Sequence, residues 1–385
     1  MHRFARLVAL GGTLAALLIG STSGASAASP SSNVVGHVYV DNNSAITNSV
    51  AGFERHLDGT LTPISGSPFA TGGAGTGRPL GSAGAIQFSA DGRYVLAVDA
   101  ASNEISILRI RHDGSLDLVD TVSSNGTTPV SLAVAGDLVY VANNGIGGSN
   151  YTGFTLNGGG HLRPIADSAY ALPDDALPGH VLFSGDGRHL VGTRVGPAAG
   201  PSSIDSFSVG DDGRLTPAPG SPFAAQRIGP FGSAFRPTNP DQLYVSNAHD
   251  GPLAGSVSAY GVAVDGTLTP IGSSPFADNQ TAPCWVEISH DGNFLFAINT
   301  GSSSISSYAI NADGSLTLLG SVPFSGTGLR PFDARLDPSG AFLYVVDAGA
   351  AKVSAFAVSG GTLAELSSSP MAIPGGVAPF GIVVD

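Results

Sequence analysis

The sequence contains very little of what most chains use for cross-linking or for surface charge. Among its 385 residues there is one cysteine, Cys284, and one lysine, Lys352. A single cysteine excludes an intramolecular disulfide, so the fold depends on strand pairing and core packing, and we interpret Cys284 as a buried hydrophobe. Charged residues make up 12% of the chain and the net charge is −13. Because an acidic surface repels phosphates, we expect neither nucleic acid nor an anionic membrane as a partner.

Helical periodicity is also missing after the first thirty residues, since no later segment repeats its apolar positions every three to four residues. At the start, Arg3 and Arg6 precede the apolar run 7–19, and Ala25-Ser26-Ala27 follows it. This order is typical of a secretory signal peptide, and the run is shorter than a typical membrane span. We therefore predict a signal peptide over 1–27, a short segment over 28–35 and a secreted, monomeric mature protein.

One pattern recurs about every 50 residues along the rest of the chain. A short apolar run, mostly after proline, leads to a turn and to a second run that ends in a small polar residue. A loop leads to a third run with a central aromatic residue or leucine, and an Asp-Gly or similar turn leads to a fourth. Units begin near Arg78, Thr128, Pro178, Pro230, Pro283 and Arg330. Each unit is therefore predicted to be a sheet of four short antiparallel strands.

The two ends of the chain complete a seventh unit. Residues 379–385 match the first strand of the repeat, and its other three strands begin at His37. A chain arranged in this way closes into a ring, which removes the exposed sheet edges of an open array. The fold class is therefore all-β, with residues 36–385 forming one seven-bladed β-propeller that is closed by pairing of the N- and C-terminal strands.

Many conspicuous polar residues belong to the repeat. The aspartates that precede glycine are typical of tight turns. A small polar residue also ends the second strand of every unit: Asn42, Asp99, Asn143, Thr193, Asn247, Asn299 and Asp347. We interpret this column as capping of the following loop, because one residue per blade lies too far from the others to share an ion. We expect no metal and no cofactor.

Candidate site residues come from the alternation of the innermost strands, whose third and fifth positions should face the central channel. Most are small or apolar, but His180, Trp285 and Asp333 occupy third positions, and Gln87, Glu287 and Arg335 occupy fifth positions. We expect the third positions at the mouth of a funnel, on the face that carries the loops between second and third strands. The alternative is a channel of ion pairs and water without chemistry.

Loops and linkers add cations to the same face. Arg194 and His249 lie in the two longest loops between second and third strands, and Arg227 and Arg330 lie in linkers between blades. Four arginines, counting Arg335, on one face of an acidic protein would suit an anionic or carboxylate ligand.

A family resemblance rests on repeated motifs. Tyr140-Val141-Ala142-Asn143 and Tyr244-Val245-Ser246-Asn247 resemble YVTN-type propeller repeats, and Asp-Gly-x-Leu-Thr-Pro followed by Ser-Pro-Phe is similar to the seven-bladed lactonase family. That family includes 6-phosphogluconolactonases and carboxymuconate-lactonizing enzymes. Pro178-Gly179-His180 and Arg330-Pro331 resemble its openings of inner strands.

Two functions remain open from the sequence. The first is hydrolysis of a lactone or small ester in the funnel, with His180 or Glu287 as the base, Arg335, Arg194 or Arg330 holding the carbonyl or a carboxylate, and Trp285 stacking on the ligand. The second is a non-catalytic extracellular propeller that binds a sugar, a peptide or a cell-wall component. In both cases the expected partner is a small molecule or saccharide.

Overall fold

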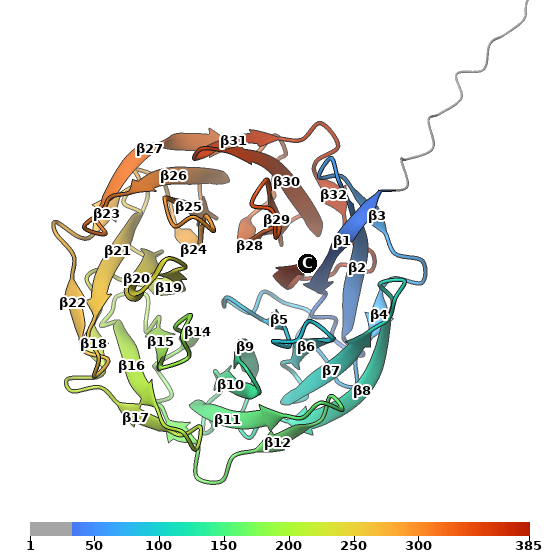
Figure 1. Ribbon diagram of the computed structural model, residues 1–385, viewed down its shortest axis with the longest axis horizontal. Coiled ribbons are helices and arrows are strands. Elements are labelled where there is room, and N and C mark those ends of the chain that lie inside the picture. The colour runs from blue at the N-terminus through green and yellow to red at the C-terminus, as the bar shows by residue number, and fades with distance from the viewer. Residues whose placement is uncertain (1–32) are drawn as a thin grey trace, which may run out of the picture. The chain divides into compact units, whose positions relative to one another are not determined.

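The computed structural model describes residues 33–385, so the expected signal peptide lies outside the described residues. Residues 33–385 contain 33 strands, and they contain no helix long and apolar enough to cross a membrane. The strands form seven antiparallel sheets arranged around a central axis, with the first strand of each sheet innermost (Figure 1). The predicted fold, an all-β seven-bladed propeller, is confirmed.

The strand bounds follow the repeat. Blade 1 contains β33 (Phe380–Val384), β1 (Val34–Asp41), β2 (Ser49–His56), β3 (Leu61–Pro63) and β4 (Phe69–Ala70). Blade 2 contains β5 (Ile86–Phe88), β6 (Tyr94–Asp99), β7 (Glu104–Ile110) and β8 (Leu116–Ser123). Blade 3 contains β9 (Pro129–Ala135), β10 (Leu138–Asn143), β11 (Asn150–Leu156), β12 (Leu162–Pro164) and β13 (Tyr170–Ala171). Blade 4 contains β14 (Pro178–Phe183), β15 (His189–Arg194), β16 (Ser203–Val209), β17 (Leu215–Pro217) and β18 (Phe223–Ala224).

The remaining blades have the same order. Blade 5 contains β19 (Pro230–Arg236), β20 (Asn239–Asn247), β21 (Ser256–Val262), β22 (Leu268–Pro270) and β23 (Phe276–Ala277). Blade 6 contains β24 (Pro283–Ile288), β25 (Phe294–Asn299), β26 (Ser304–Ile310) and β27 (Leu316–Pro323). Blade 7 contains β28 (Pro331–Leu336), β29 (Phe342–Asp347), β30 (Lys352–Ser359), β31 (Thr362–Glu365) and β32 (Met371–Ala372). In five blades the outermost strand is divided into two short pieces that both pair with the third strand.

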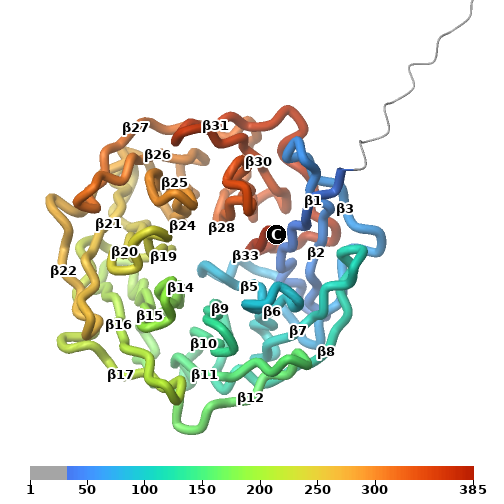
Figure 2. Tube along the Cα trace, viewed as in Figure 1, coloured from blue at the N-terminus to red at the C-terminus, as the bar shows by residue number. Residues whose placement is uncertain are grey.

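Closure of the ring follows the predicted pairing. β33 lies antiparallel to β1, with Val38 opposite Val384 and Val40 opposite Ile382. The tube view shows the red C-terminal strand beside the blue first strand (Figure 2). Arg55 adds a second connection, because its guanidinium donates to the Asp385 carbonyl and forms a buried ion pair with Asp337 of blade 7 at 3.1 Å. The two ends of the chain are therefore joined to each other and to the preceding blade.

Tyrosines on second strands connect neighbouring blades at the turn between third and fourth strands. Each hydroxyl donates to the carbonyl of the turn glycine in the next blade, at 2.7–2.9 Å: Tyr39 to Gly114, Tyr140 to Gly213, Tyr244 to Gly314 and Tyr344 to Gly59. We call these four contacts the tyrosine latches. They start from blades 1, 3, 5 and 7, and Leu96, Leu190 and Phe296 occupy the equivalent positions in blades 2, 4 and 6.

The polar column that ends each second strand bonds to the adjacent third strand, and not to the following loop as expected. Asn143, Asn247 and Asn299 each donate from Nδ2 to hydroxyls of the adjacent third strand at 2.9–3.2 Å. Asp347 occupies the same position in blade 7 and accepts from the Ser354 hydroxyl at 2.7 Å. Burial, reinforced by Glu365, raises the pKa of Asp347 to about 7.

This raised pKa predicts a pH dependence of stability. Between about pH 4 and pH 7 the folded state keeps the Asp347 proton that the unfolded chain has lost, so the free energy of unfolding should fall as pH rises through this window. Asp347→Asn introduces the residue found at this position in blades 3, 5 and 6. We expect this variant to show a difference in the free energy of unfolding between low and neutral pH that is smaller than in wild type by a few kcal/mol. Urea unfolding at pH 4.5 and 7.5 measures the change. The control Asn299→Asp should steepen it, and equal slopes in Asp347→Asn and wild type would contradict the argument.

Candidate functional site

The central axis contains a buried layer of polar and aromatic side chains. His180 (β14), Trp285 (β24) and Asp333 (β28) project from the third positions of their strands and are at most 2% exposed. The rings of His180 and Trp285 lie 5.1 Å apart between centroids, at a tilt of 47°. The expected convergence of these side chains is therefore present, but they do not form a solvent-exposed mouth.

The fifth positions form a second, partly exposed layer. The Arg335 guanidinium carbon lies 4.6 Å from the Trp285 ring centroid, and Nη1 lies 3.5 Å from Glu287 Oε2. Glu287 Oε1 accepts the Leu336 backbone N–H at 3.1 Å. Gln87 lies on β5 in the same layer and is also partly exposed. The two layers are thus connected through the stack of Arg335 on Trp285.

The protonation states follow from burial. The Ser233 backbone N–H donates to His180 Nδ1 at 3.1 Å, so the proton of the neutral ring is on Nε2. Burial, and then Arg335, lower the pKa of His180 to about 3, so the ring is neutral at pH 7 and acts as a donor. Burial also raises the pKa of Glu287, and it raises that of Asp333 to about 7, against the lowering effects of Arg335 and the Gly381 and Gly84 amides.

The loop face of the axis, which carries the loops between second and third strands, is closed by apolar side chains. Phe231, Cys284, Phe332 and Phe380 occupy second positions of inner strands, are at most 8% exposed and pack in one cluster. Burial raises the pKa of the Cys284 thiol to about 11, which makes it an unreactive part of this cluster. Access to the polar layers from this face is therefore blocked, contrary to the expected funnel mouth.

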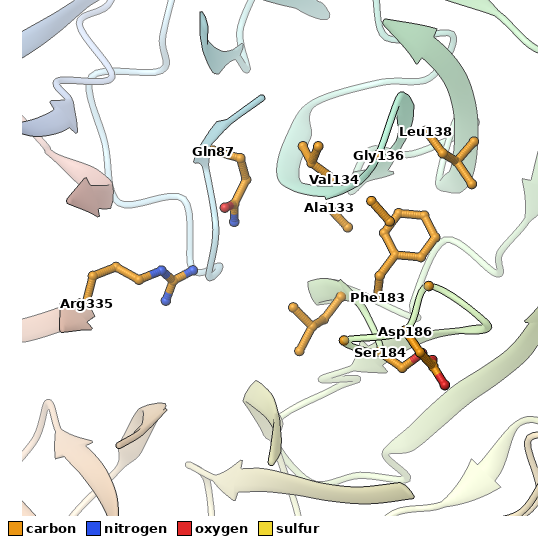
Figure 3. Close-up of a pocket in the computed structure, with 13 residues that line it drawn as sticks. Gln87, Ala133, Val134, Gly136, Leu138, Phe183, Ser184, Asp186 and Arg335 are labelled. Atoms are coloured by element: carbon orange, nitrogen blue, oxygen red, sulfur yellow. The ribbon is translucent and has the colours of Figure 1, made fainter. Parts of the chain in front are cut away.

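A cavity of about 500 Å³ lies instead at the opposite end of the axis, the turn face, beside the turns that join first and second strands. Its lining comes from blades 2, 3, 4 and 7: Gln87, Ala133, Val134, Ala135, Gly136, Leu138, Leu182, Phe183, Ser184, Gly185, Asp186, Gly187 and Arg335. Figure 3 shows Arg335 and Gln87 extending toward the open centre, across from the apolar side chains of blades 3 and 4. We call this space the turn-face cavity.

The four basic residues predicted from loops and linkers are not in this cavity. Arg194 forms two hydrogen bonds of 2.6 Å with Asp205, which also accepts from the Tyr151 hydroxyl at 3.0 Å. Arg227, Arg330 and His249 are exposed on the opposite side of the propeller. The structure therefore separates them from Arg335, whose cationic group is the one that reaches the cavity.

Comparison with known proteins places the chain in a family. The model of the seven-bladed β-propeller lactonases matches residues 37–168 and 233–380, which is more than half of the sequence. The chain belongs to the seven-bladed lactonase family. No curated protein matches it in a sequence search.

Solved structures share the fold of this lactonase-family chain. A Bacteroides uniformis protein described as a candidate 6-phosphogluconolactonase aligns with a TM-score of 0.73 and 22% identity, over 91% of this chain and 99% of that chain. A Lactobacillus plantarum protein gives 0.72 and 20%, with coverage of 91% and 99%. The periplasmic gluconolactonase of Pseudomonas aeruginosa gives 0.71 and 16%, with coverage of 91% and 98%.

Sequence reasoning about this lactonase-family chain missed one wall of the cavity. Ala133 and Leu182 occupy fifth positions in blades 3 and 4, opposite the polar fifth positions of Gln87 and Arg335. This pattern can be read from the sequence: the fifth positions are small or apolar in blades 3 and 4 and polar in blades 2 and 7, which indicates a pocket with one apolar wall and one polar wall. Within residues 33–385 no group of three or more His, Cys, Asp or Glu side chains is arranged to hold a metal ion.

Proposed function

We propose that the turn-face cavity binds a small lactone and opens its ring by hydrolysis. The observation that carries this proposal is the placement of Arg335: its guanidinium lies at the cavity wall, stacked on Trp285 and beside Glu287. Among residues 33–385 only Nη1 of this group donates to protein oxygens, which leaves Nε and Nη2 for a ligand. Membership of the lactonase family and the similarity to a periplasmic gluconolactonase support a lactone as the ligand.

The proposed chemistry uses one base and one cation. Glu287 takes a proton from water as the oxygen attacks the lactone carbonyl carbon, and Arg335 stabilises the negative charge that forms on the carbonyl oxygen. The ring C–O bond then breaks, and the alkoxide takes the proton back from Glu287. The product is a hydroxy acid whose carboxylate can pair with Arg335. Because Arg335 Nη1 lies 3.5 Å from Glu287 Oε2, this oxygen is only weakly paired and is suited to take a proton from water.

His180, which the sequence suggested as a possible base, is not the base in this proposal. Its ring is buried and neutral with the proton on Nε2, so it cannot take a proton from water at Nδ1 without losing the bond from Ser233. The pH profile should therefore reflect Glu287. Because burial raises the pKa of Glu287, the acidic limb of kcat/KM should lie above the ordinary range of a glutamate.

The test is turnover of a panel of five- and six-membered lactones, followed by acid release in a pH-stat. We expect Glu287→Gln and Arg335→Met to lower kcat/KM at least about 100-fold, the scale found for a lost base or oxyanion donor. Arg227→Met is the matched control, because that arginine is exposed and does not line the cavity. A wild-type protein inactive on the whole panel, or an Arg335→Met variant as active as Arg227→Met, would contradict the proposal.

Binding without turnover is a second candidate function, and the lining of the cavity favours it. Within residues 33–385 the lining includes no histidine, and its one carboxylate, Asp186, already accepts from the Ser184 hydroxyl and the Arg188 backbone N–H. A sugar that raises the melting temperature and changes Trp285 emission without being hydrolysed would support this function. Export of the protein, predicted from residues 1–27, remains part of both proposals, and N-terminal sequencing of culture supernatant tests it.

A further inference from the structure

The turn-face cavity extends from the central axis into a groove between blades 3 and 4. This part of the cavity is lined by apolar side chains at the ends of the inner strands and beside the turns that follow them: Ala133, Val134, Leu138, Leu182 and Phe183. Figure 3 shows Val134, Leu138 and Phe183 grouped on the side of the cavity away from Arg335. We call this part of the cavity the apolar groove.

A short turn in blade 3 leaves space for the groove. The connection between the paired ends of the first and second strands comprises residues 135–138 in blade 3 and residues 184–189 in blade 4, so it is two residues shorter in blade 3. Glycines on both sides add to the space, because a Cβ added at Gly136 or at Gly185 would have no other atom within 4 Å. No side chain of these turns therefore fills the groove.

The groove has a closed floor. The Phe183 ring packs edge to face against the Tyr140 ring of blade 3, with centroids 6.0 Å apart and planes at 74°. The two blades are therefore in contact behind Phe183, and the groove opens only toward the axis and the turn face. A bound chain would be covered by apolar side chains from both blades.

The polar side chains of the groove are already paired. The Ser184 hydroxyl donates to Asp186 Oδ1 at 2.7 Å, and this oxygen also accepts the Arg188 backbone N–H at 3.1 Å. All other lining residues of blades 3 and 4 are alanine, valine, leucine, phenylalanine or glycine. A ligand hydroxyl in the groove would lose its bonds to water without gaining a side-chain partner, which is unfavourable. An alkyl chain would instead be stabilised by leaving water.

The opposite wall of the cavity suits a polar group. Arg335 and Gln87 extend toward the centre from blades 7 and 2, across from the apolar groove. A guanidinium binds a carbonyl or a carboxylate oxygen through its N–H groups. The cavity volume of about 500 Å³ lies in the range of sites that hold ligands larger than a single small ring. The cavity therefore fits a molecule with a polar head and an apolar chain.

We propose that the ligand of the turn-face cavity is a lactone with an unbranched alkyl chain, whose ring lies at Arg335 and whose chain lies in the apolar groove. The position of the ring rests on the proposed function, whereas the groove binds the chain whether or not the ring is opened. A polyhydroxylated sugar lactone is the poorer ligand, because its hydroxyls would face the apolar wall. Hydrolysis of the alkyl lactone consumes only water and gives a hydroxy acid with the same chain.

The first test is the dependence of turnover on chain length. The γ-lactones from γ-butyrolactone to γ-decalactone share one ring and differ in the length of the alkyl chain. We expect kcat/KM to rise about three- to fourfold for each methylene until the groove is full, the factor that corresponds to burial of one methylene. Among six-membered rings, δ-decalactone should be a better substrate than D-glucono-1,5-lactone. A chain-length series without a rise, or a preference for the sugar lactone, would overturn the proposal.

The second test changes the groove. Leu182 is partly exposed and occupies the fifth position of β14, so Leu182→Asn places a polar group of similar size in the wall. Leu118→Asn is the matched control, because Leu118 is also a strand leucine, is 47% exposed and does not line the cavity. The gain per methylene should be mostly lost in Leu182→Asn and kept in Leu118→Asn. Equal gains in the two variants would indicate non-specific adsorption of the chain and would also overturn the proposal.

A binding series separates this proposal from the hydrolysis on which it rests. Linear carboxylates from butanoate to octanoate carry the head group and the chain but have no ring to open, and calorimetry measures their affinity. Affinity that rises with chain length in wild type and not in Leu182→Asn would support the groove even if no lactone were hydrolysed. Conversely, hydrolysis of lactones without any dependence on chain length would leave the roles of Glu287 and Arg335 standing and would contradict the groove.

Discussion

Deletion of residues 379–385 should leave a chain that does not fold at 25 °C. The deletion removes β33, and with it the buried side chains of Phe380, Ile382 and Val383, which are at most 3% exposed. Truncation of one large apolar core residue costs about 2–5 kcal/mol, so the loss of three, about 6–15 kcal/mol, is comparable to the whole stability of a typical domain, roughly 5–15 kcal/mol, before the lost hydrogen bonds between β33 and β1 are counted. It also exposes the paired edge of β1 to other chains. Circular dichroism and size-exclusion chromatography of the deletion variant measure the result.

Deletion of Asp385 alone is the control for that experiment. This shorter deletion removes the carbonyl that accepts from Arg55 and the N–H that donates to the His37 carbonyl, but it keeps the buried strand. Its cost should be about 1–3 kcal/mol, the scale of one or two hydrogen bonds. A melting temperature that is unchanged after removal of 379–385 would show that the ring does not need its last strand.

Replacement of Arg194 by methionine should destabilise the protein by about 3–5 kcal/mol. Asp205 is fully buried, and the two bonds from Arg194 are its main source of positive charge, since its other partner is the neutral Tyr151 hydroxyl. Removal of one member of a buried ion pair leaves an uncompensated charge, which is more costly than removal of both. Denaturant unfolding at pH 7 measures the difference from wild type.

The double variant Arg194→Met, Asp205→Asn tests the mechanism of this loss. If the buried charge is the cause, the double variant should recover much of the stability lost in the single variant. If Arg194 is instead a ligand-binding residue, as its sequence position suggested, the single variant should unfold like wild type and lose binding. The structure predicts the first outcome, because the guanidinium is committed to Asp205.

The fold could be predicted from the sequence because its information is local and repeated. Each blade has its own turn glycines, and the aromatic or leucine of the third strand is buried in every unit, from Phe53 and Phe154 to Phe356. The alternation of inner strands also identified which side chains face the axis. His180, Trp285 and Asp333 follow from a period of two, without knowledge of any contact between blades.

The open end of the axis could not be predicted in the same way. It depends on how side chains from different blades pack against one another. Phe332 of blade 7 and Phe380 of blade 1 help to close the loop face because their rings meet across the blade boundary, with centroids 4.7 Å apart. The pairing of Arg194 with Asp205 is likewise a contact between adjacent strands whose register fixes it. Loop position alone placed that arginine at a site, whereas the register places it in a buried ion pair.

The tyrosine latches also determine where the ring would come apart. Because seven is an odd number, latches that start from alternate blades leave one blade with two of them. This is blade 1, which contains both ends of the chain: its Tyr39 donates to blade 2, and its Gly59 accepts from Tyr344 of blade 7. Under force or heating, we therefore expect the boundaries of blade 1 with its neighbours to stay closed and the ring to open at another boundary between blades. The seams that follow blades 2, 4 and 6 have no such latch, because Leu96, Leu190 and Phe296 have no hydroxyl. At the first two of these seams another hydroxyl reaches the turn of the next blade, from Tyr94 to the Gly158 carbonyl and from Ser206 to the Gly266 carbonyl. Within residues 33–385 no side-chain hydrogen bond reaches the turn at Gly361 of blade 7. We therefore expect the ring to open first between blades 6 and 7, and amide hydrogen exchange to be fastest in the strands on the two sides of this boundary.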